Sequence, residues 1–179
     1  MTKPDKAVFA YAVGLTRNFL CAMMKRKCDD YNKEGIRMID SFRGEYYFLS
    51  NFYEAPVLYD GITYQNNEAA FQAQKTLDME KRKEFASLSP NLAKRAGRRV
   101  LLRTDWEQVK YTVMYEVCRA KFTQNPALGQ QLLATGDEEL IEGNNWGDRI
   151  WGQVNGKGQN HLGKILMRVR DELRSTGKE

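Results

Sequence analysis

The sequence is poor in histidine and cysteine, and this scarcity excludes several kinds of site. One histidine, His161, and three dispersed cysteines, Cys21, Cys28 and Cys118, do not have the spacing of a zinc site. An odd, scattered set of thiols is no disulfide framework and is typical of a reducing compartment, so we expect a cytoplasmic protein. We expect neither a bound metal nor a redox cofactor, although carboxylates and water alone leave a metal site open.

Long hydrophobic runs are also missing. The apolar run that begins at residue 7 stops at Leu15, which is too short to span a bilayer, and no small-residue cleavage pattern follows it. We interpret residues 7–24 as an amphipathic helix that packs on the domain or on a protein partner, with loose membrane contact as the alternative. Residues 1–38 hold eight Lys and Arg against four Asp and Glu, which predicts a helical, basic N-terminal extension.

Residues 39–179 have the length and composition of one globular domain. They are nearly neutral, with twenty Lys and Arg against nineteen Asp and Glu. Eight cations nevertheless gather between residues 81 and 103. This cluster could bind along a polyphosphate or along a nucleic-acid backbone. The alternative is that it forms the solvated face of helices.

Turn and cap signals divide the domain into short elements. The sequence Asp60-Gly61 between two β-prone runs predicts a hairpin, and residues 46–49 read as a short strand. Helix starts are indicated by Asn66 or Asn67, Ser89-Pro90, Thr104 to Glu107 and Asn125-Pro126. The sum is five or six helices with a few short strands, without an internal repeat or βαβ alternation.

The stretch from Gly143 to Gly163 holds two Trp, one Asp and six Gly, and its apolar residues lack the period of a helix or strand. We interpret it as a loop built for contact. It leads into a helix with Asn160 as the expected cap, and the amides of a helix N-terminus suit an anion such as phosphate. A plain glycine-rich connection is the alternative.

Glu68, Gln72 and Lys75 share one face of the helix predicted after Asn67. A solvent-facing stripe would explain this spacing, but Asp148, between Trp146 and Trp151, suggests chemistry. Cleavage of a bond between a sugar carbon and a base nitrogen develops positive charge that a fixed carboxylate stabilises. A carboxyl group of raised pKa can donate the proton, a lysine can form a Schiff base, and indoles offer stacking faces.

The chain resembles the NADAR domain family, which includes the YbiA-like N-glycosidases. The matching motifs run in family order over residues 42–174: F-L-S-N-F-Y (48–53), D-G-I-T-Y (60–64), E-A-A-F-Q-A-Q-K (68–75), S-P-N-L-A-K-R-A-G-R (89–98), D-W-E-Q-V-K (105–110), V-M (113–114), A-K-F (120–122), L-L-A-T-G (132–136), W-G-D-R-I-W-G (146–152) and G-Q-N-H-L-G-K-I-L-M (158–167). Two positions depart from it: Ala69 replaces a frequent His, and Ile150 a frequent aromatic residue.

The resemblance implies an α+β, mainly helical fold and hydrolysis of an N-glycosidic bond between a ribose and a base. Family substrates are early riboflavin-pathway intermediates or ADP-ribose on guanine in nucleic acid. The catalytic residues expected by motif are Glu68, Lys75 and Asp148, with their roles left open. The expected substrate-binding residues are Asn51, Phe52, Gln72, Trp146, Trp151, Gly152, Gly158 and Asn160.

Two other functions stay open at this point. The domain could be a non-catalytic module that binds ADP-ribose or NAD, or a nucleic-acid binding protein that uses the cluster between residues 81 and 103. The partners we expect are a ribose-phosphate or ADP-ribose substrate, including ADP-ribosylated nucleic acid, and a protein bound through the N-terminal helix.

Overall fold

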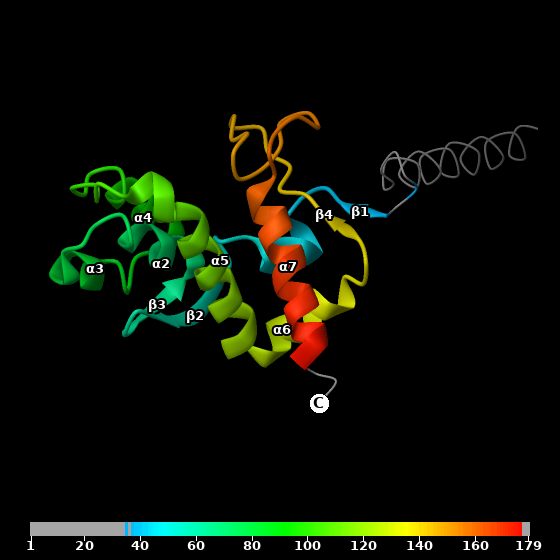
Figure 1. Ribbon diagram of the computed structural model, residues 1–179, viewed down its shortest axis with the longest axis horizontal. Coiled ribbons are helices and arrows are strands. Elements are labelled where there is room, and N and C mark those ends of the chain that lie inside the picture. The colour runs from blue at the N-terminus through cyan, green and yellow to red at the C-terminus, as the bar shows by residue number, and fades with distance from the viewer. Residues whose placement is uncertain (1–34, 36, 177–179) are drawn as a thin grey trace, which may run out of the picture. The chain divides into compact units, whose positions relative to one another are not determined.

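The computed structural model describes residue 35 and residues 37–176, and the account below concerns the unit of residues 39–179. The described part is α+β and mainly helical, as predicted (Figure 1). Its elements are β1 (Met38–Ile39), the 3₁₀-helix η1 (Gly44–Leu49), β2 (Glu54–Tyr59), β3 (Ile62–Asn66), α2 (Asn67–Ala73), α3 (Met79–Glu84), α4 (Pro90–Ala96), α5 (Trp106–Gln124), α6 (Pro126–Ala134), β4 (Glu139–Leu140) and α7 (His161–Thr176). Residues 1–34 and 36 lie outside the described part, so the helical extension, its protein partner and the domain boundary stay predictions.

Helix α5 is the centre of the domain. In Figure 1 it lies between α7 on one side and the group formed by α2, α4 and the β2–β3 hairpin on the other. The predicted apolar stripe of α5 provides this contact, because Val113, Met114 and Val117 are buried and Val109 is partly buried. The helix therefore joins the segment before residue 100 to the C-terminal helix through one core.

The hairpin forms as the Asp60-Gly61 pair predicts. Strands β2 and β3 are antiparallel, with Tyr59 opposite Ile62. Asp60 and Gly61 both have positive φ, 50° and 77°, which is the conformation that such a two-residue turn requires. Short strands β1 and β4 form a second pair, held by the amide of Ile141, which donates to the carbonyl oxygen of Ile39 at 2.8 Å.

Two local predictions are wrong. Residues 46–49 belong to the 3₁₀-helix η1 instead of a strand, because Phe48 and Leu49 are buried side by side in the core, whereas a strand turns successive side chains to opposite faces. Helix α5 begins at Trp106 without the expected capping box. The carboxylate of Asp105 binds the guanidinium of Arg103 at 2.6 Å and 2.8 Å and makes no cap hydrogen bond.

The cap of α2 is formed as predicted. The side chain of Asn66 accepts a hydrogen bond from the amide of Ala69 at 2.8 Å and donates to the carbonyl oxygen of Leu88 at 2.9 Å. Pro90 and Pro126 open α4 and α6 as expected, although neither Ser89 nor Asn125 makes a side-chain cap bond.

Among the described residues, no helix combines the length and the apolar character that crossing a bilayer requires.

Candidate active site

A single cavity of about 540 Å³ brings together residues from both halves of the domain. All three predicted catalytic residues line it: Glu68, Lys75 and Asp148. Five of the predicted substrate-binding residues line it as well: Asn51, Phe52, Gln72, Trp146 and Trp151. Helix α2 and the loop of residues 143–160, which lie far apart in the sequence, thus face one space of the size that small-molecule sites have.

Helix α2 brings Glu68 and Gln72 to the cavity, and Lys75 follows directly after the helix. The face is not a solvent-exposed stripe, since Glu68 and Gln72 are buried and Lys75 is half-buried. The amide nitrogen Nε2 of Gln72 donates to Oε1 of Glu68 at 2.9 Å. The backbone amide of Glu68 donates to the carbonyl oxygen of Asn51 at 3.0 Å, so the turn after η1 is fixed to the start of α2.

Burial changes the acid–base properties of this helix face. It raises the pKa of Glu68, an effect that Lys94, the Gln72 hydrogen bond and Lys75 partly oppose. It also lowers the pKa of Lys75, and Arg98 and Lys94 lower it further while Glu68 raises it. Both shifts favour the uncharged forms, a carboxylic acid and a free amine, close to each other in the cavity.

Asp148 is held rigidly by its own loop. Its Oδ1 accepts hydrogen bonds from the amides of Ile150 at 3.0 Å and Trp151 at 2.9 Å. Its backbone is bonded on both sides by the side chain of Asn144, which accepts from the Asp148 amide at 3.0 Å and donates to the Asp148 carbonyl at 2.7 Å. These bonds fix the direction in which the carboxylate points.

The two loop indoles have different surroundings. Trp151 is partly buried and packs against Phe71 and Tyr111, with ring centroids 5.4 Å apart in each pair. Trp146 is 54% exposed at the cavity, and the guanidinium carbon of Arg43 lies 5.8 Å from its ring centroid. Trp151 is therefore part of the wall, whereas Trp146 keeps a face open for a ligand.

Gly152, Gly158 and Asn160 are not among the residues that line the cavity. A Cβ on Gly152 would lie 2.1 Å from the carbonyl oxygen of Glu142, and one on Gly158 would lie 2.3 Å from that of Gly152. The Asn160 side chain donates to the carbonyl oxygen of Leu140 at 2.8 Å and accepts from the amide of Glu142 at 3.1 Å. The described contacts of these residues are thus within the loop or with the segment of residues 140–142 before it, and their binding of substrate stays a prediction.

The predicted anion site at the start of α7 is wrong. The amides of His161 and Leu162 already donate to the carbonyl oxygens of Ile150 at 3.2 Å and Trp151 at 3.0 Å. Asn160 stands before the helix, as expected, but its side chain bonds Leu140 and Glu142 instead of capping the first turn. The first two amides of the helix thus fix the loop and are not available to a phosphate.

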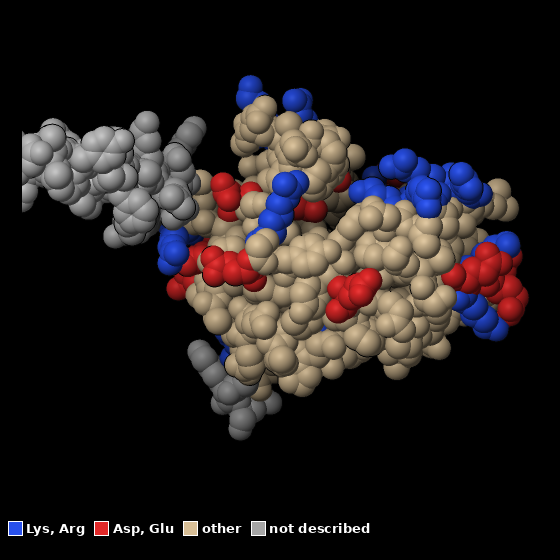
Figure 2. All heavy atoms as spheres, turned by 180° about the vertical axis from the view of Figure 1, so that it is seen from behind, with Lys and Arg blue, Asp and Glu red and all other residues tan. Residues whose placement is uncertain are grey.

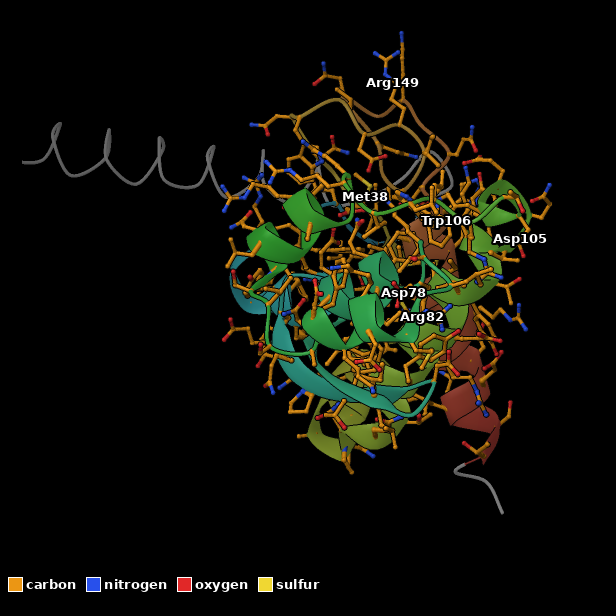
Figure 3. All side chains as sticks on the ribbon, turned by 90° about the vertical axis from the view of Figure 1, so that its left-hand side faces the viewer. Met38, Asp78, Arg82, Asp105, Trp106 and Arg149 are labelled. Carbon is orange, nitrogen blue, oxygen red and sulfur yellow. The ribbon has the colours of Figure 1, made fainter. Side chains whose placement is uncertain are left out.

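The basic cluster between residues 81 and 103 divides into two parts. Four cations pair with nearby carboxylates: Lys81 with Glu84, Arg82 with Asp60, Lys83 with Glu80 and Arg103 with Asp105. Lys94 lines the cavity, while Arg95, Arg98 and Arg99 are exposed on α4 or just after it. Figure 2 shows Lys and Arg gathered over the α4 end, beside a recess that separates them from the projecting loop. Figure 3 places the cation Arg149 on that loop, pointing away from the domain.

The cavity also contains charged residues that the sequence did not single out for catalysis. They include Glu142, Arg43, Lys94 and Lys110. Burial raises the pKa of Glu142 to about 7; Asp148 and Glu68 raise it as well, while Lys94 lowers it. The signal in the sequence was weak, because Glu142 stands alone between the apolar Leu140-Ile141 pair and Gly143. Within the described residues, no group of three or more His, Cys, Asp and Glu has a metal-binding arrangement.

Known proteins resemble this chain over most of its length. Residues 40–174 match the model of the NADAR domain. A protein named N-glycosidase YbiA from Shigella flexneri is 44% identical over 133 residues, which are 72% of this chain and 82% of that protein. A riboflavin biosynthesis protein of Vibrio vulnificus is 41% identical over 70% of this chain and 35% of its own length. The NMR structure of E. coli YbiA matches with a TM-score of 0.71 at 40% identity, covering 84% of this chain and 89% of that one.

Proposed function

Because this chain belongs to the NADAR domain family, we propose that it is an N-glycoside hydrolase that releases a base from a ribose. One observation carries this proposal. The acid Glu68, the amine Lys75 and the carboxylate Asp148 line a single cavity although they come from distant parts of the chain. Names of similar proteins include N-glycosidase and riboflavin biosynthesis protein, which is consistent with the same chemistry.

In the proposed reaction, Lys75 and Glu68 act as a pair. The neighbouring Lys75 ammonium passes a proton to the Glu68 carboxylate, which the opposed pKa shifts of the two groups favour. The free amine then forms a bond to the anomeric carbon as the glycosidic C–N bond breaks, and the base leaves with the electron pair and a proton. Opening of the sugar ring gives a Schiff base, which water hydrolyses to the free sugar and the amine.

Asp148 supports the same step without moving. Positive charge develops on the sugar as the C–N bond breaks, and a carboxylate already held in place by two amides stabilises it without reorganisation. Trp146, with its exposed face, provides a stacking surface for the departing base or for a second heterocycle.

For the substrate, we propose a phosphoribosyl or ADP-ribosyl group. Three cations, Arg43, Lys94 and Lys110, line the cavity beside the reactive groups and suit one or more phosphates. Both an early riboflavin-pathway intermediate and ADP-ribose on guanine in nucleic acid have this chemistry. We propose a cytoplasmic location on the basis of the scattered thiols.

One incubation series tests the activity and separates the substrates. The full chain is mixed with ADP-ribosylated guanine DNA, and separately with riboflavin precursors that carry a ribose phosphate, and the released base and sugar are identified by mass spectrometry. We expect product with one of the two. No product from either, together with tight calorimetric binding of ADP-ribose, would instead establish a non-catalytic binding module.

The exposed arginines of α4 favour a second candidate function, binding to nucleic acid. Arg95, Arg98 and Arg99 form no ion pair within the part of the chain that the structure describes, and they lie on or just after α4, the helix that also brings Lys94 to the cavity. This function predicts binding to unmodified DNA that weakens strongly between low and high salt. Binding that does not depend on salt would exclude it.

A further inference from the structure

We infer that Glu142 transfers the proton in this reaction: it protonates the departing base and then takes a proton from the attacking water. The inference rests on the proposed hydrolysis and adds a third carboxyl group to it. Glu142 lines the same cavity as Glu68 and Asp148 but comes from the segment between β4 and the loop. Three observations support the assignment: its fixed backbone, its unbonded side chain and its charged neighbours.

The backbone of Glu142 is held on both sides. Its amide donates to Oδ1 of Asn160 at 3.1 Å, and its carbonyl oxygen accepts from the amide of Gln153 at 2.9 Å. Gly152 passes so close to this carbonyl that a Cβ there would lie 2.1 Å from the oxygen. Asn160 and Gly152, predicted from the sequence to bind substrate, therefore have a contact with Glu142 that explains their identity: they position it from the far side of the loop.

The side chain of Glu142 differs from the other two carboxyl groups. Oε1 of Glu68 is occupied by the amide of Gln72, and Oδ1 of Asp148 accepts two backbone amides. Within the described residues, the carboxyl oxygens of Glu142 make no hydrogen bond to protein. A carboxyl group that is held by its backbone but free at its oxygens can exchange a proton with a ligand.

Burial and the neighbouring charges bring the pKa of Glu142 near neutral pH, where the carboxyl group can exchange protons. Burial raises the pKa of Glu142 to about 7, and the negative charges of Asp148 and Glu68 add to this effect, while Lys94 opposes it. At neutral pH the carboxyl group is thus present in both forms, so it can give a proton in one half of the reaction and accept one in the other. General acid–base catalysis is most efficient when the pKa lies near the working pH.

The proton balance is complete within the site. The protonated carboxyl of Glu142 gives its proton to the base nitrogen that receives the electron pair of the breaking C–N bond. During hydrolysis of the Schiff base, water adds to the carbon and its proton returns to the Glu142 carboxylate. The released Lys75 amine takes back the proton that Glu68 had accepted from it. One water is consumed, a free sugar and a neutral base are formed, and Glu142, Glu68 and Lys75 return to their starting forms.

The test compares Glu142→Gln and Glu142→Asp with the wild-type chain on whichever substrate the incubation series identifies. We expect Glu142→Gln to lower kcat by roughly 10²- to 10⁴-fold, the usual contribution of general acid–base catalysis, with KM changed only a few-fold. In the wild type, kcat/KM should fall as the pH rises through about 7, because the donor form is lost. This fall should be absent in Glu142→Gln and present in Glu142→Asp.

The control is Glu80→Gln, which removes one exposed carboxylate that does not line the cavity. Its kcat should equal the wild-type value, and circular dichroism should show that all variants are folded. The inference is overturned if Glu142→Gln keeps kcat within threefold of the wild type, or if its pH profile still falls through about pH 7. A wild-type chain without turnover on any substrate would instead overturn the proposed function itself.

Discussion

Gln72 donates to Glu68 across one turn of α2, and the Cα of Gly97 at the end of α4 packs directly on this glutamine. A Cβ at position 97 would lie 1.9 Å from Oε1 of Gln72. Because residue 97 is a glycine, the side-chain amide of Gln72 has the space that it needs to donate to the buried Glu68. This relationship connects the packing of α2 against α4 with the protonation of Glu68, because the Gln72 hydrogen bond opposes the rise in the pKa of that residue.

The first prediction concerns this contact. In Gly97→Ala, Gln72 must turn away, the bond to Glu68 is lost, and the pKa of Glu68 rises further. Because Glu68 must be ionised to accept the Lys75 proton, activity should begin to fall at a higher pH when the solution is acidified. Profiles of kcat/KM against pH should agree for Gly97→Ala and Gln72→Ala. Leu92→Ala, an exposed change on the same helix, should keep the wild-type profile, and an unchanged acidic limb in Gly97→Ala would contradict the link.

The second prediction concerns the Schiff base. Sodium borohydride added during turnover should reduce it to a stable amine, so that the chain gains the mass of the reduced sugar at Lys75. Peptide mass spectrometry locates the adduct. Lys75→Ala should give no adduct and no turnover, and Glu68→Gln should form it much more slowly, by about 10²-fold or more if the carboxylate acts as general base. Turnover of Lys75→Ala at the wild-type rate would show that water attacks the sugar directly.

The third prediction separates the two indoles of the loop. Trp146→Ala should raise KM by roughly 5- to 150-fold, which corresponds to stacking worth about 1–3 kcal/mol, and should leave kcat nearly unchanged. Trp146→Phe, which keeps an aromatic face, should restore most of the affinity. Steady-state kinetics on the identified substrate measure both constants. A loss confined to kcat would show that the ring acts on the reaction and not on binding.

The fourth prediction concerns Lys121, a fully buried residue of α5. Its ammonium nitrogen Nζ donates to the carbonyl oxygens of Phe48 at 2.6 Å and Ser50 at 2.9 Å, so it fixes the end of η1 just before Asn51. Burial lowers the pKa of Lys121 to about 7. The unfolded chain thus binds one more proton than the folded chain above that pH, and this residue should make stability increase as the pH rises from 7 to 8.5.

Urea unfolding at several pH values measures this effect as the difference between the wild type and Lys121→Met. The slope of the difference should approach about 1.4 kcal/mol per pH unit, the value for one proton. The range stops at pH 8.5 because the neighbouring Cys118 has the opposite effect at higher pH: burial raises the pKa of its thiol to about 12. A difference that does not change with pH would mean that Lys121 titrates alike in both states.

The sequence predicted most of the local structure because the signals were local. Asp60-Gly61 and Asn66 act through the bonds and dihedral angles of their own neighbours, and both formed as expected. The strand at residues 46–49 failed because the burial of Phe48 and Leu49 in the folded core, which is a tertiary effect, decided the conformation. Secondary-structure preference was too weak to resist it.

In the candidate site, too, the residues with local signals could be predicted and the residues placed by tertiary contacts could not. Glu68, Lys75 and Asp148 could be chosen from helix spacing, chemistry and motif resemblance. Glu142 could not, since its place in the cavity depends on Gly152 and Asn160, which lie ten or more positions further along the chain. The role of Gly152 and Asn160 could not be predicted either, because a glycine or an amide side chain can serve a ligand or a crowded carbonyl oxygen equally well.

The amides at the start of α7 are bound by the carbonyl oxygens of Ile150 and Trp151, so the last helix and the wall of the cavity cannot loosen independently. A glycine-rich segment of this length would ordinarily exchange its amide hydrogens quickly. Here the protection of these amides from hydrogen exchange should match that of α7. Any change that frays α7, even at the end remote from the cavity, should therefore also make the reactive groups less ordered.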